Sequence, residues 1–382
     1  MTSLPPNAAQ GRIASLDGLR AIAIALVLIS HGSYSLPSFM QNIFLENGGL
    51  GVRIFFVLSG FLIYTLSSRE IAKHGDFNVR NFYIRRVIRI FPAFYTYLAL
   101  VAALSTIGYL SVTWQSLLCA GTFTMNLESL FVQWLGMGTL GIWVVVHYWT
   151  LAVEEQFYAS WPLVIWLRAR DLLWPVLWAV MLAGPISRVL TYALLPTLRP
   201  SIGFLLSYDA IAGGVLLGLC HERWPRFRTL FANHSHQWRR HSAVIASFSF
   251  ILIASPLLNS QFGGLYRLPF GLSLEIAAIT LLITLLTQPQ HTWYFTFLNH
   301  PAITSIGVLS YSLYLYNMLF LDESRGDWIT QSPQNFGVLF AAAIISYHLI
   351  EKPFFKLRRF ARNKSIPETE TETMSTSTEA TK

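Results

Sequence analysis

The chain has 382 residues, of which 53% are hydrophobic and 14% aromatic, while only 12% are charged. Soluble domains carry about 25% charged residues, so this composition excludes an ordinary water-soluble domain and also a disordered chain. Lysine and arginine (27) outnumber aspartate and glutamate (19), and the net charge of +8 fits either nucleic acid or the cytoplasmic face of a membrane. The two cysteines, Cys119 and Cys220, allow no disulfide framework and are expected to be buried apolar residues.

Long apolar stretches recur along the whole chain, each near the ~20 residues that a membrane-spanning helix needs. They predict an all-α, polytopic integral membrane protein with about ten transmembrane helices, near residues 16–36, 50–66, 91–110, 149–168, 172–194, 203–220, 242–258, 268–287, 302–320 and 334–350.

The basic residues set the expected orientation, because short cytoplasmic loops are rich in lysine and arginine. The predicted loop 67–89 holds Arg69, Lys73, Arg80, Arg85, Arg86 and Arg89. We therefore place this loop and the N-terminus in the cytoplasm. The later basic segments fall on the same side only if residues 111–147 do not cross. We predict that 111–147 is an outer loop or a re-entrant segment and that both termini are cytoplasmic.

The predicted domains follow from these spans. Residues 1–15 form an N-terminal cytoplasmic segment, and 16–357 form one transmembrane domain. Residues 358–382, rich in Thr, Ser and Glu, are expected to be a disordered cytoplasmic tail.

Polar side chains inside the first span suggest a functional helix, because such groups are costly in lipid. Arg20 and His31 are 11 positions apart. That is about three helical turns, which places them on one face and roughly 16 Å apart. The alternative is that Arg20 reaches lipid headgroups and that His31 only joins two helices.

The fourth span offers a carboxylate. Glu154 is expected about five residues below the outer surface, at a depth similar to that of His31. An imidazole paired with a carboxylate suits base catalysis on a hydroxyl, so we predict that His31 and Glu154 meet. An interhelical hydrogen bond is the alternative for Glu154.

On the cytoplasmic side, Arg86 and Arg89 share a helix face and are candidates for binding phosphate. The alternative is that Arg86 and Arg89 only determine the membrane topology. Arg53 needs a partner near the outer face, and Ser59 either acts in the site or bonds to its own helix backbone. We find no nucleotide-binding glycine loop and no metal-ligand spacing, so no metal is expected.

Residues 16–20 (LDGLR) followed by His31 resemble the opening of the acyltransferase family 3 proteins, which are membrane-bound enzymes that acylate sugars and other acceptors. The resemblance extends over about residues 11–357. Its further segments are 51–63 (GVRIFFVLSGFLI), 86–89 (RVIR), 149–158 (WTLAVEEQFY) with 161–162 (WP), 208–214, 307–315 and 351–353.

The resemblance implies transfer of an acyl group, usually acetyl, from cytoplasmic acyl-CoA to a hydroxyl. His31 and Glu154 match the family's catalytic histidine and glutamate, and Arg20, Arg86 and Arg89 match positions that would meet the CoA phosphates. Acetyl-CoA, or another acyl-CoA, would be a co-substrate, with no permanently bound cofactor. Direct transfer and an acyl-His31 intermediate both stay open.

Two positions depart from the family pattern. Thr150 stands where members often have serine, and Tyr316 with Asn317 replaces a Trp-His pair. Asn317 would still hydrogen-bond an acceptor. The residues assigned to substrate binding are Arg53, Ser59, Trp149, Tyr158 and Asn317.

The expected acceptor is a cell-surface or lipid-linked saccharide at the bacterial cytoplasmic membrane. No hydrolase-like domain follows the last span, so we expect the chain to deliver the acyl group itself or to a separate partner, such as a polysaccharide-assembly protein. Nucleic acid is not an expected partner. Alternatives are a macrolide-like acceptor, a transporter or flippase of a glycan precursor, and a scaffold.

Overall fold

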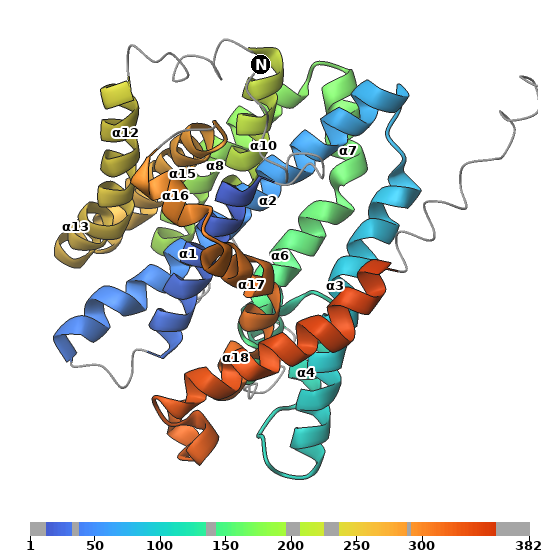
Figure 1. Cartoon of the computed structure of the whole chain (residues 1–382), viewed down its shortest axis with the longest axis vertical. Coiled ribbons are helices and arrows are strands. Elements are labelled where there is room, and N and C mark those ends of the chain that lie inside the picture. Colours follow the sequence, from blue (N-terminus) through green and yellow to red (C-terminus); the bar gives the residue numbers. More distant parts are fainter. Residues whose placement is uncertain are drawn as a thin grey trace, which may run out of the picture.

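A computed structural model describes residues 13–32, 38–134, 143–195, 207–224, 237–288 and 292–356. Throughout these ranges the chain forms helices and no strand. The predicted tail 358–382 and most of the predicted segment 1–15 lie outside them. The helices gather into one bundle around α1 (Ala14–His31), as Figure 1 shows. The prediction of an all-α polytopic membrane protein is confirmed.

The helices that follow are given in chain order. The first half holds α2 (Ser38–His74), α3 (Val79–Thr106), α4 (Trp114–Gly121), η3 (Met125–Leu127), α5 (Glu128–Trp134), η4 (Trp143–Val145), α6 (Tyr148–Ala159), α7 (Trp161–Ala169) and α8 (Leu173–Leu194). The second half holds α10 (Tyr208–Arg223), α12 (Gln237–Ser249), η7 (Phe250–Ala254), α13 (Ser255–Phe262), α14 (Gly264–Tyr266), η8 (Arg267–Gly271), α15 (Leu272–Leu286), α16 (Trp293–Leu298), α17 (Pro301–Phe320), η9 (Glu323–Arg325), η10 (Trp328–Thr330), α18 (Gln334–Ser346) and η11 (Tyr347–Glu351).

Among the described residues, eight helical stretches are long and apolar enough to cross a membrane. They are Ala14–His31, Gly48–His74, Val79–Thr106, Leu173–Leu194, Trp238–Phe262, Gly264–Leu286, Pro301–Arg325 and Gln334–Lys356. The other two predicted spans are shorter helices. The fourth is divided at Ser160 into α6 and α7, with Pro162 in the first turn of the second helix, and the sixth is α10 with 16 residues.

The predicted basic loop 67–89 is mostly helical instead. α2 continues to His74 and α3 already begins at Val79, after Asn78, whose side chain accepts a hydrogen bond from the backbone N–H of Asn81 at 2.8 Å. The turns of a helix that lie outside the lipid need no apolar residues. The hydropathy pattern therefore did not show that α3 begins before residue 91. Arg86 and Arg89 therefore lie on the first turns of α3.

Residues 111–147 contain only short helices in their described part, so no spanning helix lies there, as predicted. The ring of Phe94 is stacked with those of Phe123 and Tyr148, with each pair of centroids 4.4 Å apart. Phe94 precedes the end of α3 at Thr106 by 12 residues, or about 18 Å of helix. The described part of the segment thus turns back to the middle of α3, which is the path of a re-entrant segment.

Glycines bring the central helices into backbone contact. A Cβ atom at Gly60 of α2 would overlap the carbonyl oxygen of Ile211, and one at Gly214 of α10 would overlap that of Val57. Gly307 of α17 lies against the backbone of Asp17 in the same way. Small residues at such contacts are typical of membrane helix packing. Because Asp17 lies beside Gly307 and His31 beside Asn317, α1 and α17 run in the same direction.

A buried ion pair joins α8 to α10. Arg188 Nη1 lies 2.7 Å from Asp209 Oδ2, and the two side chains are 1% and 2% exposed. The same guanidinium donates to the carbonyl oxygen of Leu268 at 3.3 Å and to the hydroxyl of Ser273 at 3.3 Å. The pair thus also ties these helices to the start of α15.

We expect Arg188→Met to destabilise the fold by about 3 to 5 kcal/mol, because it leaves the Asp209 carboxylate buried without its partner. The measurement is the midpoint of thermal unfolding in mild detergent. Removing both charges, as in Arg188→Met with Asp209→Leu, should recover much of the loss. A single variant as stable as the wild type would contradict the role of this ion pair.

The two ends of α3 should be reached from opposite sides of the membrane. With Cys119 and Cys220 replaced by serine, Arg80→Cys should react with a membrane-impermeant maleimide from the cytoplasm only. Ile107→Cys, at a position that is 75% exposed, should react from outside only. Labelling of both cysteines from one side would refute the topology.

Candidate functional site

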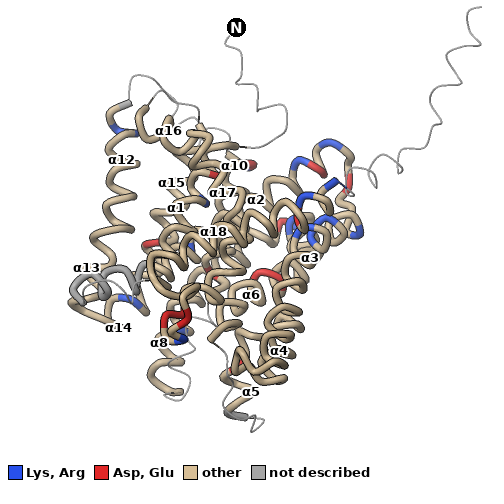
Figure 2. Tube along the Cα trace, turned by 60° about the horizontal axis from the view of Figure 1, so that its bottom comes forward, with Lys and Arg blue, Asp and Glu red and all other residues tan. Residues whose placement is uncertain are grey.

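A cavity of about 720 Å³ lies at the end of the bundle where the basic residues gather. Figure 2 shows these lysines and arginines clustered around the ends of α2 and α3. The volume is within the range of about 300 to 1,000 Å³ found for small-molecule sites. Its polar lining comes from six helices, η11 and the residue that follows α15, and comprises Asp17, Arg20, Ser59, Thr65, Ser68, Arg69, Arg86, Arg89, Glu154, Tyr158, His221, Glu222, Thr287, Ser310, Tyr311, Tyr347 and Glu351.

The acidic residues of this lining already have partners within the protein. Asp17 forms an ion pair with Arg20 at 3.1 Å. Glu222 is paired with Arg168 and accepts a hydrogen bond from Tyr64 at 2.6 Å. The carboxylate of Glu351 accepts a hydrogen bond from the Ser312 hydroxyl. Some guanidinium groups in the described lining of the cavity therefore have no carboxylate at ion-pair distance.

Arg86 and Arg89 are the clearest of these groups. Within the described ranges, neither has a carboxylate at ion-pair distance. The guanidinium of Arg86 lies over the ring of Tyr158, 4.8 Å from its centroid, and over that of Phe82 at 5.5 Å. Such cation–π contacts hold the group in place without consuming its N–H donors. The structure thus brings together Arg20, Arg86 and Arg89, as the sequence predicted.

Glu154 belongs to this cavity, and its predicted pairing with His31 is wrong. Its carboxylate accepts hydrogen bonds from the hydroxyl of Ser59 at 2.5 Å and from that of Tyr158. In the part of the chain that the structure describes, no hydrogen bond or ion pair joins it to His31. The depth was misjudged because α6 begins beside the middle of α3, at Phe94, and not at the level of the α3 end at Thr106. The re-entrant segment delivers Tyr148 to the level of Phe94, and Glu154 lies about 9 Å further inward.

A polar network holds α6 at this depth. The amide oxygen of Gln156 accepts from the Tyr208 hydroxyl at 2.5 Å and from Asn126 at 3.0 Å. Its amide nitrogen donates to the carbonyl oxygen of Phe123 at 2.8 Å. Amides whose hydrogen bonds are satisfied in this way fix a single arrangement of α6, and with it the position of Glu154.

His31 lies at the other end of α1, beside α17 and the start of α6. Its Nδ1 atom is 2.6 Å from Oδ1 of Asn317, whose side chain is fully buried. A second imidazole, His147, lies within electrostatic reach of His31, and its Nε2 donates to the carbonyl oxygen of Leu315 at 3.0 Å. The sequence interpretation missed His147, although it stands two residues before the predicted segment 149–158.

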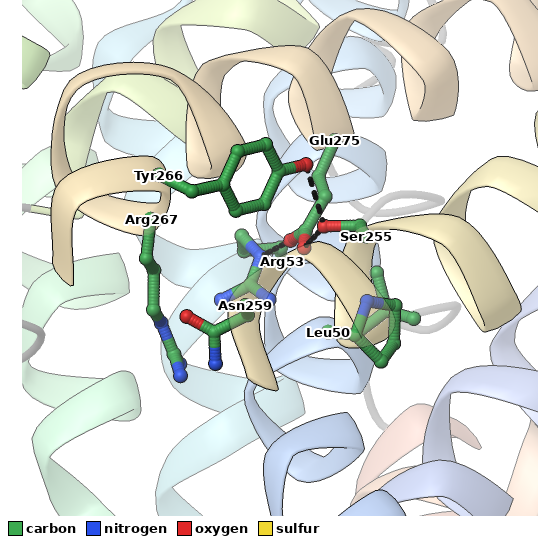
Figure 3. Close-up of a pocket in the computed structure, with 8 residues that line it drawn as sticks. Leu50, Arg53, Ser255, Asn259, Tyr266, Arg267 and Glu275 are labelled. Carbon is green, nitrogen blue, oxygen red and sulfur yellow. Dashed lines mark hydrogen bonds and ion pairs between the residues drawn. The ribbon is translucent and has the colours of Figure 1, made fainter. Parts of the chain in front are cut away.

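Arg53 occupies a separate, small pocket, shown in Figure 3. It forms an ion pair with Glu275, which also accepts a hydrogen bond from Ser255 at 2.5 Å. Glu275 is thus the partner that the sequence required for Arg53. The pocket has a volume of about 10 Å³, enough for about one water molecule, and Arg267 also lines it.

The residues assigned to substrate binding are therefore divided among several places. Ser59 and Tyr158 line the large cavity with Glu154. Trp149 packs edge-on against Phe56, with ring centroids 6.0 Å apart. Asn317 contacts His31, and Arg53 lies in the small pocket. Sequence reasoning did not assign Arg69, His221, Glu222 and Glu351 to the cavity, because they come from helices far apart in the chain.

The sequence is similar to several known proteins. Residues 13–350 match the family described as acyltransferase domain. One relative, from Staphylococcus aureus (strain COL), is named as an inferred O-acetyltransferase. It is 27% identical over 363 residues, covering 90% of this chain and 57% of its own length. Peptidoglycan O-acetyltransferase OatA of Listeria monocytogenes is 24% identical over 365 residues, covering 90% and 56%. YrhL of Bacillus subtilis, an inferred peptidoglycan O-acetyltransferase, is 24% identical over 377 residues, covering 89% and 54%.

The chain thus spans about half the length of the curated relatives that it matches. No solved structure matches it significantly. The family match extends over nearly the whole described chain, from α1 to η11. The protein is therefore a member of acyltransferase family 3, the family that its motifs resemble.

Proposed function

We propose that this chain is a membrane O-acyltransferase that moves an acyl group, in the first instance acetyl, from cytoplasmic acyl-CoA to a hydroxyl of an acceptor. The observation that carries the proposal is the arrangement along α1. Arg20 lines a 720 Å³ cavity at the basic end of the helix, and His31 lies about three turns away at its other end.

The cavity suits the donor in both size and charge. Coenzyme A carries its phosphates at one end and the thioester at the other, joined by a flexible arm. Guanidinium groups bind phosphate oxygens bidentately, so Arg86 and Arg89 would hold the phosphates, with Arg20 beside them. The thioester would then point along α1 toward His31.

His31 would act as the base. Its imidazole takes the proton from the acceptor hydroxyl while the hydroxyl oxygen attacks the thioester carbonyl. The carbon–sulfur bond breaks, an ester forms, and the leaving thiolate of CoA receives the proton. Glu154, hydrogen-bonded to Ser59 and Tyr158, would position the cavity wall beside the thioester rather than orient His31.

The names of the relatives support a saccharide acceptor. OatA of Listeria monocytogenes is a peptidoglycan O-acetyltransferase, and the other relatives named above are also bacterial proteins. We therefore propose a cell-envelope or lipid-linked saccharide as the acceptor and the bacterial cytoplasmic membrane as the location. A protein with this arrangement would bring the acyl-CoA and the saccharide acceptor together from opposite sides of the bilayer.

The first test of the function follows the acetyl group. Membranes that contain the protein should incorporate label from acetyl-labelled CoA into envelope glycans, and His31→Ala should abolish the incorporation because the base is lost. His74→Ala, at an exposed position outside the cavity, is the matched control and should keep full activity. Equal label in the wild type and in His31→Ala would refute the role of His31. Substrate movement without any label would favour a transporter.

The second test concerns the donor phosphates. Arg86→Gln and Arg89→Gln should each raise the KM for acetyl-CoA by about tenfold or more with little change in kcat, because phosphate binding contributes equally to the ground and transition states. Arg170→Gln, an exposed arginine at the end of α7, is the control. Initial rates at varied acetyl-CoA measure the effect. An unchanged KM in both variants would place the donor elsewhere.

A further inference from the structure

We propose that Asn317 is a positioning residue that fixes which nitrogen of His31 carries the proton. The inference rests on the proposed function, in which His31 is the base. It revises the assignment of Asn317 to acceptor binding, because the amide of this residue is already engaged on both sides.

The geometry places the amide between two fixed groups. Asn317 is fully buried on α17, and its Oδ1 lies 2.6 Å from Nδ1 of His31. Its amide nitrogen donates to the carbonyl oxygen of Tyr314, one turn earlier on the same helix. A fully buried side chain with these two partners has no face left for a substrate.

The chemistry of the partners determines the proton. A backbone carbonyl can only accept a hydrogen bond, so the NH₂ group of Asn317 must face Tyr314 and its oxygen must face His31. An amide oxygen can only accept as well. Nδ1 of His31 therefore carries the hydrogen, and in the neutral ring Nε2 is left with a free lone pair. That lone pair is what a base needs in order to receive a proton.

The orienting carbonyl is itself held in place. The hydroxyl of Tyr314 donates to the carbonyl oxygen of His147 at 2.9 Å and lies 2.7 Å from the hydroxyl of Thr150. His147 in turn donates to the carbonyl oxygen of Leu315. These contacts join α17 to the start of α6 on both sides of the turn that binds Asn317.

An amide partner also differs from a carboxylate in its effect on the charge of the base. A carboxylate would stabilise the imidazolium strongly and retain the proton. The neutral amide orients the ring without that charge, so the imidazolium formed in the reaction is not held by a negative partner and can pass its proton on to the thiolate. The structure thus replaces the predicted His31–Glu154 pair with a partner that sets the tautomer but adds no negative charge.

The direct test reads the tautomer without any reaction. Full-length protein with ¹⁵N-labelled histidine rings is examined by NMR, and the His31 signals are assigned from their loss in His31→Ala. We expect a protonated Nδ1 and a bare Nε2 in the wild type. Asn317→Leu should remove this preference. Asn299→Leu is the matched control, because the amide of Asn299 likewise donates to a carbonyl oxygen one turn earlier on its helix, that of Phe295 at 2.6 Å, and the adjacent Leu298 packs on Gly18, at the other end of α1 from His31.

The kinetic test separates positioning from a purely structural role. Asn317→Leu should lower kcat by roughly a hundredfold while the KM for acetyl-CoA stays the same, since general base catalysis contributes about that much or more. Asn317→Asp keeps the acceptor atom but adds a charge, so activity should be retained at high pH and the acidic limb of the pH–rate profile should move to higher pH. Asn299→Asp should leave the profile unchanged.

A wild-type His31 with its proton on Nε2 would overturn the proposal, as would an Asn317→Leu variant with normal kcat. Failure of the proposed function gives a different result. In that case the tautomer would depend on Asn317 as expected, but His31→Ala would still transfer the label.

Discussion

The arrangement of the whole site depends on close backbone contact between α1 and its neighbours. Lipid supplies no hydrophobic force between helices, so association relies on tight packing, and a side chain at Gly307 would separate α17 from α1. Because the two helices run in the same direction and in contact, Asn317 arrives at the level of His31. Gly60 and Gly214 bring α2 to α10 in the same manner, which places Ser59 and Glu222 on one cavity.

In the proposed reaction the chemistry is thereby divided along α1 into a donor end and a transfer end. The donor end has guanidinium groups from α1, α2 and α3, with each acidic residue bound to a partner of its own. The transfer end has two imidazoles and an amide: backbone carbonyls hold His147 and Asn317, and the amide oxygen of Asn317 holds His31. Glu154 belongs to the donor end, so the transfer end of the described structure has no carboxylate in contact with His31. This division explains why the polar residues of the spans fall into separate groups.

The sequence predicts the class of fold and most of the site for identifiable reasons. Apolar length identifies spanning helices directly, and the spacing of Arg20 and His31 places them on one face of α1. Depth is different, because hydropathy records whether a segment is apolar and not where it turns. The re-entrant segment has short helices of ordinary composition, so the level of Glu154 depended on the stacking of Phe94, Phe123 and Tyr148. The partner of His31 also depended on a contact 286 residues away in the chain, which no local pattern encodes.

The layer between the cavity and His31 has an electrical consequence. His31 does not line the cavity, and it lies about three turns of α1 away from Arg20, which does. In the proposed orientation, a membrane potential would fall mainly across this stretch rather than across the full thickness of the bilayer. In the proposed reaction a proton leaves a hydroxyl on the outer side and reaches a thiolate on the inner side, while the acyl group that moves outward is neutral. One positive charge therefore moves inward, and complete passage is worth about 2.3 kcal/mol per 100 mV. An energised membrane, negative inside, would pull this reaction toward the acylated product.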